Sequence, residues 1–155
     1  PIYESEAFTE NIWISGLPRL HIDVSTATVG GQIYALLEDC SEDGLCIHIG
    51  HAIMDLRYHE GGNQEQTWLP IFETINAKME FFAMDVQIEA GHTIRLSLAS
   101  TGEDYLPAST SSIVEVSEGS GSNLLLDVIN AEEKLLFNPP SCKHQACLDW
   151  LNQTV

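Results

Sequence analysis

The chain has 155 residues, 44% of them hydrophobic, and its 23 Asp and Glu outnumber 6 Lys and Arg to give a formal net charge of −17 at pH 7. This length suits one domain with one hydrophobic core, and the apolar content is too high for a disordered chain. The negative charge excludes nucleic acid and anionic membranes as partners, and no apolar run approaches the ~20 residues that span a bilayer. The acidic residues are scattered, which fits either a solvated surface or adaptation to high salt.

Apolar and polar residues alternate with the period of a β-strand through much of the chain, so that one face of each alternating strand is expected to meet a core. Residues 32–38 are apolar on both faces and are expected to form an inner strand. The apolar phase shifts within residues 46–58, from Ile47 and Ile49 to Met54, and this predicts a bulge or bend near residues 50–52. The turn at residues 89–92 predicts an antiparallel hairpin between the strands on either side of it. In chain order, strands are predicted at residues 12–14, 20–25, 32–38, 46–58, 82–89, 94–99, 113–116 and 124–129.

Glycine-containing turns separate these segments, and short strands divided by such turns indicate an all-β sandwich or barrel. Only one helix is predicted, where Ser141 follows Pro139 and Pro140 and would cap a short helix to about residue 151. The chain therefore divides into a β-sandwich domain, residues 1–137, and a cysteine-containing tail, residues 138–155, expected to form that short helix.

The four cysteines fall into two pairs that are close in sequence. Cys40 and Cys46 flank the turn signal Asp43-Gly44, and a hairpin there would bring them close enough to form a disulfide. Cys142 and Cys147 could close a second small loop in the tail. Free thiols are the main alternative, because neither pair has the spacing of a zinc site. Disulfides would indicate an extracellular or periplasmic protein and free thiols a cytoplasmic one, and no signal peptide is visible at the N-terminus.

No catalytic motif is recognisable, since the G-x-S-x-G elbow is absent and the glycine-serine stretch at residues 119–122 has a different spacing. His48, His51 and His59 cluster in sequence, but His48 and His51 would face opposite sides of a strand unless a bulge realigned them, so scattered histidines are the favoured interpretation. The acidic turn formed by Asp39, Glu42 and Asp43 lacks the calcium-loop pattern and is interpreted as solvated. No metal, cofactor or catalytic residue is assigned.

The tryptophans are the remaining candidates for a ligand site. Trp13, Trp68 and Trp150 could form a platform on which a sugar stacks. Aromatic residues of a sandwich more commonly belong to its core or to an interface, and that interpretation is favoured. Trp13 and Trp68 are kept as weak candidates for ligand stacking.

The order of several segments resembles the C-terminal domain of the X-Pro dipeptidyl-peptidase family, which also includes bacterial cocaine esterase and glutaryl-acylase-like hydrolases. The resemblance covers roughly residues 2–130, is most specific in GHTIRLSLAS at residues 91–100, and departs from the family at Cys40, Ser41 and Asp127. The tail from Asn138 has no counterpart in it. The resembling segments are ISGLP at residues 14–18, QIYALLEDCSEDG at 32–44, IGHAIMDLR at 49–57, GHTIRLSLAS at 91–100 and NLLLDV at 123–128.

The resemblance implies a jelly-roll β-sandwich of the galactose-binding-like type. In that family the catalytic Ser, Asp and His belong to a separate α/β-hydrolase domain, so no catalytic residue is carried over to this chain. The leading hypothesis is therefore a non-catalytic accessory domain of a serine hydrolase. It would bury an apolar patch on one sheet against the hydrolase domain, stabilise that domain and help shape its active-site entrance. A stand-alone carbohydrate- or peptide-binding module is the alternative, an independent enzyme ranks third, and a homo-oligomer is left open.

Overall fold

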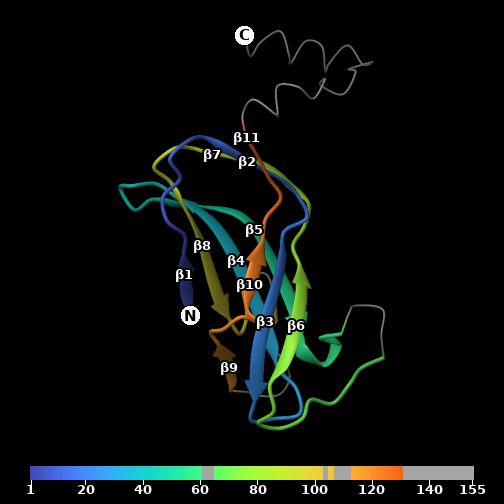
Figure 1. Cartoon of the computed structure of the whole chain (residues 1–155). Coiled ribbons are helices and arrows are strands. Elements are labelled where there is room, and N and C mark those ends of the chain that lie inside the picture. The colour runs from blue at the N-terminus through green and yellow to red at the C-terminus, as the bar shows by residue number, and fades with distance from the viewer. Residues whose placement is uncertain (61–64, 103–104, 107–112, 131–155) are drawn as a thin grey trace, which may run out of the picture.

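The computed structural model describes residues 1–60, 65–102, 105–106 and 113–130, which form two antiparallel β-layers packed face to face (Figure 1). The predicted tail of residues 138–155, with its helix, Cys142 and Cys147, lies outside the described residues. No helix in the described ranges is long and apolar enough to cross a membrane. The strands are β1 (Ile2–Glu4), β2 (Ile12–Gly16), β3 (Arg19–Thr26), β4 (Gln32–Cys40), β5 (Cys46–Asp55), β6 (Ile75–Glu80), β7 (Met84–Ile88), β8 (Thr93–Ala99), β9 (Val114–Ser117), β10 (Asn123–Leu125) and β11 (Val128–Asn130), and one 3₁₀ turn, η1, covers Leu56–Tyr58.

The first layer is a four-stranded antiparallel sheet in the order β1-β8-β4-β5. Its central strand, β4, buries Ile33, Ala35 and Leu37 and turns the residues between them outward, as the period of two requires. The irregularity expected in the β5 segment is present slightly earlier than predicted, since Leu37 pairs with Gly50 but Glu38 pairs with His48. One extra residue is thereby accommodated as a bulge.

The second layer consists of three long strands, each interrupted at the same level by a bend, and of the short strand β9, which pairs with β3. β2 continues into β3, β7 lies beside β2 as β6 lies beside β3, and β11 and β10 line the opposite side. The bend between β2 and β3 contains Gly16, whose φ of 141° favours glycine, and a Cβ there would lie 2.7 Å from the Asp127 carboxylate. Pro18 follows it and cannot donate a backbone hydrogen bond to a neighbouring strand. The layer therefore curves around the core.

The hairpin predicted around residues 89–92 is wrong, because the two strands that flank this turn lie in different layers. β7 pairs with β2, whereas β8 pairs with β4 and β1. The turn crosses the core, as connections of a jelly roll do. Alternation predicted both strands correctly but carries no information on whether two neighbouring strands share a sheet, since each has one apolar face in either case.

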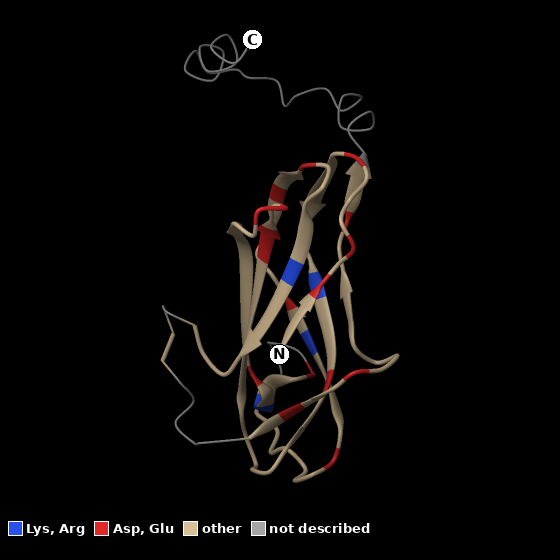
Figure 2. Cartoon of the chain, turned by 90° about the vertical axis from the view of Figure 1, so that its left-hand side faces the viewer, with Lys and Arg blue, Asp and Glu red and all other residues tan. Residues whose placement is uncertain are grey.

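The core lies between the layers and draws on both of them. Ile14, Ile22 and Ile88 of the second layer and Leu37 of the first are fully buried. Each such side chain contributes roughly 1.5–3 kcal/mol by leaving water. Among the described residues, the acidic side chains lie outside this core, spread over strands and loops along the molecule, and Lys and Arg form no continuous stripe in the view of Figure 2. The observed fold is the all-β sandwich expected from the sequence.

Candidate docking surface

The turn between β4 and β5 closes one end of the sandwich with its own bonds. Cys40 and Cys46, which face each other in the ladder with their Cα atoms 4.0 Å apart, form a disulfide. Inside this loop the Ser41 hydroxyl donates to Asp43 Oδ1 at 2.5 Å and lies 3.0 Å from the Leu45 carbonyl, and the Leu45 amide donates to Asp43 Oδ1 at 3.3 Å. The hydrogen bond from Ser41 is the main factor that holds the pKa of the Asp43 carboxyl below its usual value. The turn is therefore closed by a disulfide and by hydrogen bonds among its own residues.

Two of the three clustered histidines come together on the outer face of the first layer. The bulge in β5 turns His48 and His51 to the same side, where their ring nitrogens lie 3.3 Å apart, and His51 also lies 3.0 Å from the Tyr105 hydroxyl. Tyr34 and Phe82 complete an aromatic group around His51. Within the described ranges, no group of three or more His, Cys, Asp or Glu side chains is placed to hold a metal ion.

The other candidates from the sequence lie apart from one another. His59 contacts the Leu56 carbonyl at 2.9 Å, and Asp39 pairs with His92 at 2.8 Å, beside the turn that carries Asp43. Trp13 lies on β2, whereas Trp68 lies in the loop that precedes β6. The structure does not bring these two tryptophans together, and stacking of a ligand on either one remains a prediction.

No Ser-His-acid arrangement is formed by the residues that the structure describes. His92 and Asp39 are the closest approach to one, but there is no serine hydroxyl in these ranges that hydrogen-bonds to a histidine. The serine hydroxyls with known partners, those of Ser5, Ser41 and Ser122, contact backbone carbonyls, backbone amides or Asp43.

At the opposite end of the sandwich, three loops are joined by backbone hydrogen bonds. The Leu69 amide donates to the Val29 carbonyl at 3.1 Å and the Phe72 amide to the Thr26 carbonyl at 2.8 Å, so the loop before β6 lies along the loop after β3. The Ala27 amide donates to the Ile113 carbonyl at 3.3 Å, which brings the start of β9 to the same place. Leu69 is buried and anchors this loop in the core.

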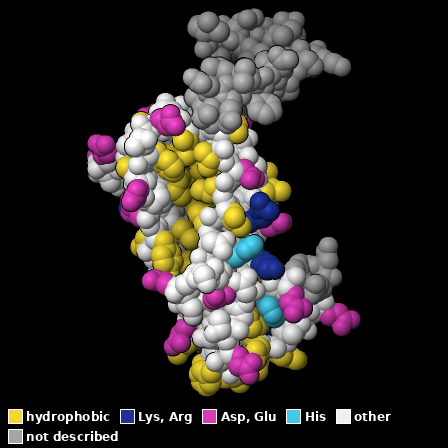
Figure 3. All heavy atoms as spheres, in the orientation of Figure 1, with side chains coloured by type: hydrophobic (Ala, Val, Ile, Leu, Met, Phe, Trp, Pro, Cys, Tyr) yellow, Lys and Arg dark blue, Asp and Glu magenta, His cyan; other side chains and the backbone are white. Residues whose placement is uncertain are grey.

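These joined loops expose five large apolar side chains, which we call the loop-end surface. Trp68 is 66% exposed, Phe72 78% and Ile113 69%, although each has a hydrophobic side chain that water solvates poorly. Hydrophobic side chains gather at this lower end of the molecule in Figure 3. Contiguous exposed apolar groups of this kind mark interaction sites on soluble proteins. The loop-end surface consists of Val29, Trp68, Ile71, Phe72 and Ile113.

Phe72 is held in an unfavourable backbone conformation. Its φ is 62°, and it is the one non-glycine residue with positive φ among those described. It occupies the third position of a turn in which the Glu73 amide approaches the Pro70 carbonyl at 3.5 Å, a position that normally takes glycine. Such strain costs on the order of 1 kcal/mol and is concentrated at functional sites. An exposed aromatic ring at a strained position fits a side chain that is presented to a partner.

A partly buried ion pair between Asp55 and Arg57 lies next to the loop that carries Trp68. Asp55 accepts hydrogen bonds from the Arg57 backbone amide and from Arg57 Nε, each at 3.0 Å, and so caps η1. These contacts with Arg57 hold the pKa of the Asp55 carboxyl below its ordinary value. The Arg57 carbonyl in turn accepts from the Thr67 amide at 2.9 Å, directly before Trp68. The exposed ring therefore projects from a loop with fixed ends.

The sequence did not predict this surface as a unit. Of its five members, only Trp68 was considered as a functional candidate, either as a residue of the core or an interface or as part of a platform on which a sugar stacks. Exposure of Ile71 and Phe72 has no signal in the alternation, because both lie between strands, and no local pattern predicts positive φ at a phenylalanine. The apolar patch was expected on one sheet, whereas the loop-end surface is built from loops.

Comparison with known proteins identifies a family and a common fold. The family model described as the X-Pro dipeptidyl-peptidase C-terminal non-catalytic domain matches residues 1–121. Among solved structures, an aminopeptidase from a marine sediment Thaumarchaeota archaeon has a TM-score of 0.72 at 13% identity, over 83% of this chain and 25% of that one. No curated protein sequence matches.

Two further structures show the same fold. A CocE/NonD family hydrolase from Staphylococcus aureus has a TM-score of 0.72 at 11% identity, covering 83% of this chain and 30% of that one. An alpha-amino acid ester hydrolase has a TM-score of 0.71 at 17% identity, covering 83% of this chain and 25% of that one. This chain thus spans between a quarter and a third of the length of these neighbours.

Proposed function

Because the chain belongs to the family of X-Pro dipeptidyl-peptidase C-terminal non-catalytic domains, we propose that it packs through its loop-end surface on the α/β-hydrolase domain of a serine hydrolase. In this role it stabilises the hydrolase domain, and its loops help shape the entrance to the active site. The catalytic Ser, His and acid belong to the hydrolase domain. Residues 1–137 constitute the accessory domain in this proposal.

The observation that carries this proposal is the exposure of Trp68, Phe72 and Ile113 on hydrogen-bonded loops at one end of the sandwich. Aromatic side chains dominate the energetics of protein interfaces, because they bury a large area with few rotatable bonds. Anchoring by buried Leu69 keeps the loop in place before the partner arrives, which reduces the entropic cost of association.

Charge at the rim defines the complementary surface. Glu65 and Glu73 are exposed on the same loop, on either side of the apolar side chains. With a net charge of −17 on the chain, the partner surface is expected to carry Lys or Arg around an apolar centre. Salt should therefore slow association more than it accelerates dissociation, because rim charges act mainly on the association rate.

The test is association of the 155-residue chain with the α/β-hydrolase polypeptide encoded with it, measured by size-exclusion chromatography and by the thermal stability of the hydrolase. The variant Trp68→Ser/Phe72→Ser is compared with Leu45→Ser/Ile47→Ser. The second variant removes two similarly exposed apolar side chains from the disulfide-bonded end of the sandwich.

We expect the loop-end variant to weaken association at least about 100-fold, because two aromatic anchors of an interface each contribute on the order of 2 kcal/mol. The control variant should bind like the unaltered chain. Equal weakening by both variants, or by neither, would show that another surface binds the hydrolase domain.

A further inference from the structure

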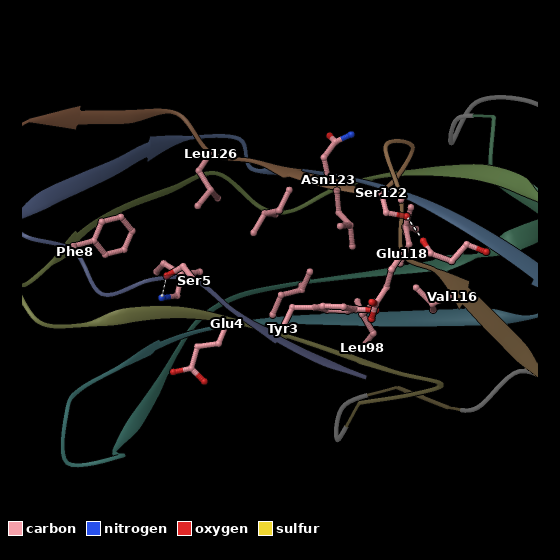
Figure 4. A pocket seen from close by; sticks show the side chains of 17 residues that line it. Tyr3, Glu4, Ser5, Phe8, Leu98, Val116, Glu118, Ser122, Asn123 and Leu126 are labelled. Atoms are coloured by element: carbon pink, nitrogen blue, oxygen red, sulfur yellow. Dashed lines mark hydrogen bonds between the residues drawn. The ribbon is translucent and has the colours of Figure 1, made fainter.

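A cavity opens between the two layers on the side where β1 faces β9 and β10. Its volume is about 510 Å³. Side chains converge on it from both layers in Figure 4, and Figure 3 shows hydrophobic side chains within a hollow of the face turned to the viewer. The apolar walls include Phe8, Leu96, Leu98, Val116, Leu124 and Leu126.

An excursion of the chain between β9 and β10 builds one wall of this cavity. Asp23 of β3 pairs with Ser117, and His21, two residues earlier on β3, pairs with Asn123, six residues later on the facing segment. The facing segment therefore contains extra residues that bulge out between these two pairs. The Ser122 hydroxyl accepts from the Asp23 amide at 3.0 Å and donates to the Ser117 carbonyl at 2.7 Å. A Cβ at Gly121 would overlap the Asp23 carboxylate. The excursion is thus fixed by specific contacts.

The cavity is open to solvent, so its apolar walls face water and an occupant would bury them. Pockets that bind small molecules have volumes of roughly 300–1,000 Å³ with mainly apolar walls and a few polar groups. The cavity lies within that range and has such walls.

The polar end of the cavity is acidic. Tyr3 extends across it toward Glu118, and burial together with the charge of this carboxylate raises the pKa of Tyr3. Glu4 points away from the cavity and is paired with Arg95 at 3.2 Å. Neither Lys nor Arg lines the cavity, and among the described residues Glu118 takes part in no ion pair.

We propose that this cavity binds a small amphipathic amine, with its aliphatic or aromatic body between the layers and its ammonium group at Glu118. Glu118 is exposed at the rim of the apolar cavity and has no ion-pair partner among the described residues. A carboxylate so placed favours a cationic donor, because charge-assisted hydrogen bonds are about twice as strong as neutral ones. The same carboxylate and the negative net charge repel a fatty-acid head group. The cavity shares no residue with the loop-end surface, so this site does not depend on the proposed docking.

The test is calorimetric titration of the full chain with n-octylammonium, n-octanoate and 1-octanol, each below the concentration at which it aggregates. Octylammonium should bind saturably at one site and about tenfold more tightly than octanoate. The variant Glu118→Gln should reduce that preference to less than about threefold, because it removes the charge and keeps the size of the side chain.

A matched pair of tryptophan variants locates the site. Leu124 faces the cavity, whereas Leu125, its neighbour on β10, is 41% exposed on the opposite face. Leu124→Trp should fill the cavity and abolish binding of octylammonium, while Leu125→Trp should leave it unchanged. Should Leu124→Trp fail to fold, methyl NMR of the unaltered chain replaces it, with octylammonium expected to shift Leu124 and Leu126 and not Leu125.

Three results would overturn the proposal. One is the absence of saturable binding of octylammonium. Another is equal affinity for octylammonium and octanoate, which would show an apolar groove that does not select a cation. The third is an equal effect of the two tryptophan variants, or methyl shifts at Leu125 alone, which would place the ligand on the outer surface.

Discussion

The two ends of β4 finish the same sandwich in opposite ways. At Cys40 the chain turns through a short loop that a disulfide and hydrogen bonds from Ser41 close, and its exposed apolar side chains are limited to the neighbouring Leu45 and Ile47. At Gln32 the sandwich ends in three joined loops that expose five large apolar side chains, one of them on a strained backbone. The first end is closed by its own covalent and hydrogen bonds, and the second exposes apolar side chains on loops held by hydrogen bonds, where we propose that a partner binds.

The largest change in the free energy of unfolding is expected at the loop end, where Leu69 is buried and its neighbour Trp68 is exposed. Leu69→Ala should lower the free energy of unfolding by about 3 kcal/mol, because it leaves a cavity under the loop. Trp68→Ser, one position away and exposed, should change it by less than about 0.5 kcal/mol. Urea unfolding followed by circular dichroism measures both. Similar losses in the two variants would mean that Trp68 belongs to the fold and is not presented to a partner.

The disulfide-bonded end should respond next most strongly. Cys40→Ala/Cys46→Ala removes a bond between residues separated by six positions, which should lower the free energy of unfolding by about 2 kcal/mol through chain entropy. Addition of a reductant to the unaltered chain should produce the same loss, and the double variant should be insensitive to it. A loss in the variant without any effect of the reductant would contradict the disulfide.

The third prediction concerns pH and the ion pair beneath the loop end. Arg57 lowers the pKa of Asp55 in the folded protein, so the pair stabilises the fold above the unfolded pKa of about 3.9. This contribution is lost as pH falls through the folded pKa, and it amounts to at most about 1 kcal/mol for a partly exposed pair. Unfolding at pH 7 and at successively lower pH should show a smaller loss in Asp55→Asn than in the unaltered chain. An identical loss of stability in both proteins would show that the Asp55–Arg57 pair does not contribute to the pH dependence.

The smallest effect is the most informative about presentation of the aromatic ring. Phe72→Gly relieves the positive φ and should raise the free energy of unfolding by about 0.5 kcal/mol, the difference between relieved strain and the added flexibility of glycine. Ile71→Gly, in the same turn without positive φ, should lower it by a similar amount. Destabilisation by both changes would show that Phe72 is retained for stability.

The sequence predicted the sandwich well because alternation reports directly on burial. β8 follows the alternation residue by residue, and the phase shift near Gly50 in the sequence corresponds to the bulge in β5. The β4 segment is apolar on both faces in the sequence, but in the structure only every second residue from Ile33 to Leu37 is buried. The sequence could not predict which strands pair with each other. The strands on either side of residues 89–92 show the same alternation of apolar and polar residues whether they share a sheet or lie in opposite layers.

The loop-end surface escaped prediction for a different reason. Its members come from three segments far apart in sequence, Val29, residues 68–72 and Ile113, which only the fold brings together. The sequence could locate Cys40 and Cys46 as partners because both ends of their loop are local. Sites assembled from distant loops carry no such local mark.

The most direct test of the central claim is hydroxyl-radical footprinting of the chain alone and in complex with its α/β-hydrolase domain. We expect Trp68 and Phe72 to lose most of their reactivity in the complex, while Leu45 and Ile47 at the disulfide-bonded end keep theirs. Unchanged reactivity at Trp68 and Phe72 in a complex that forms would contradict it.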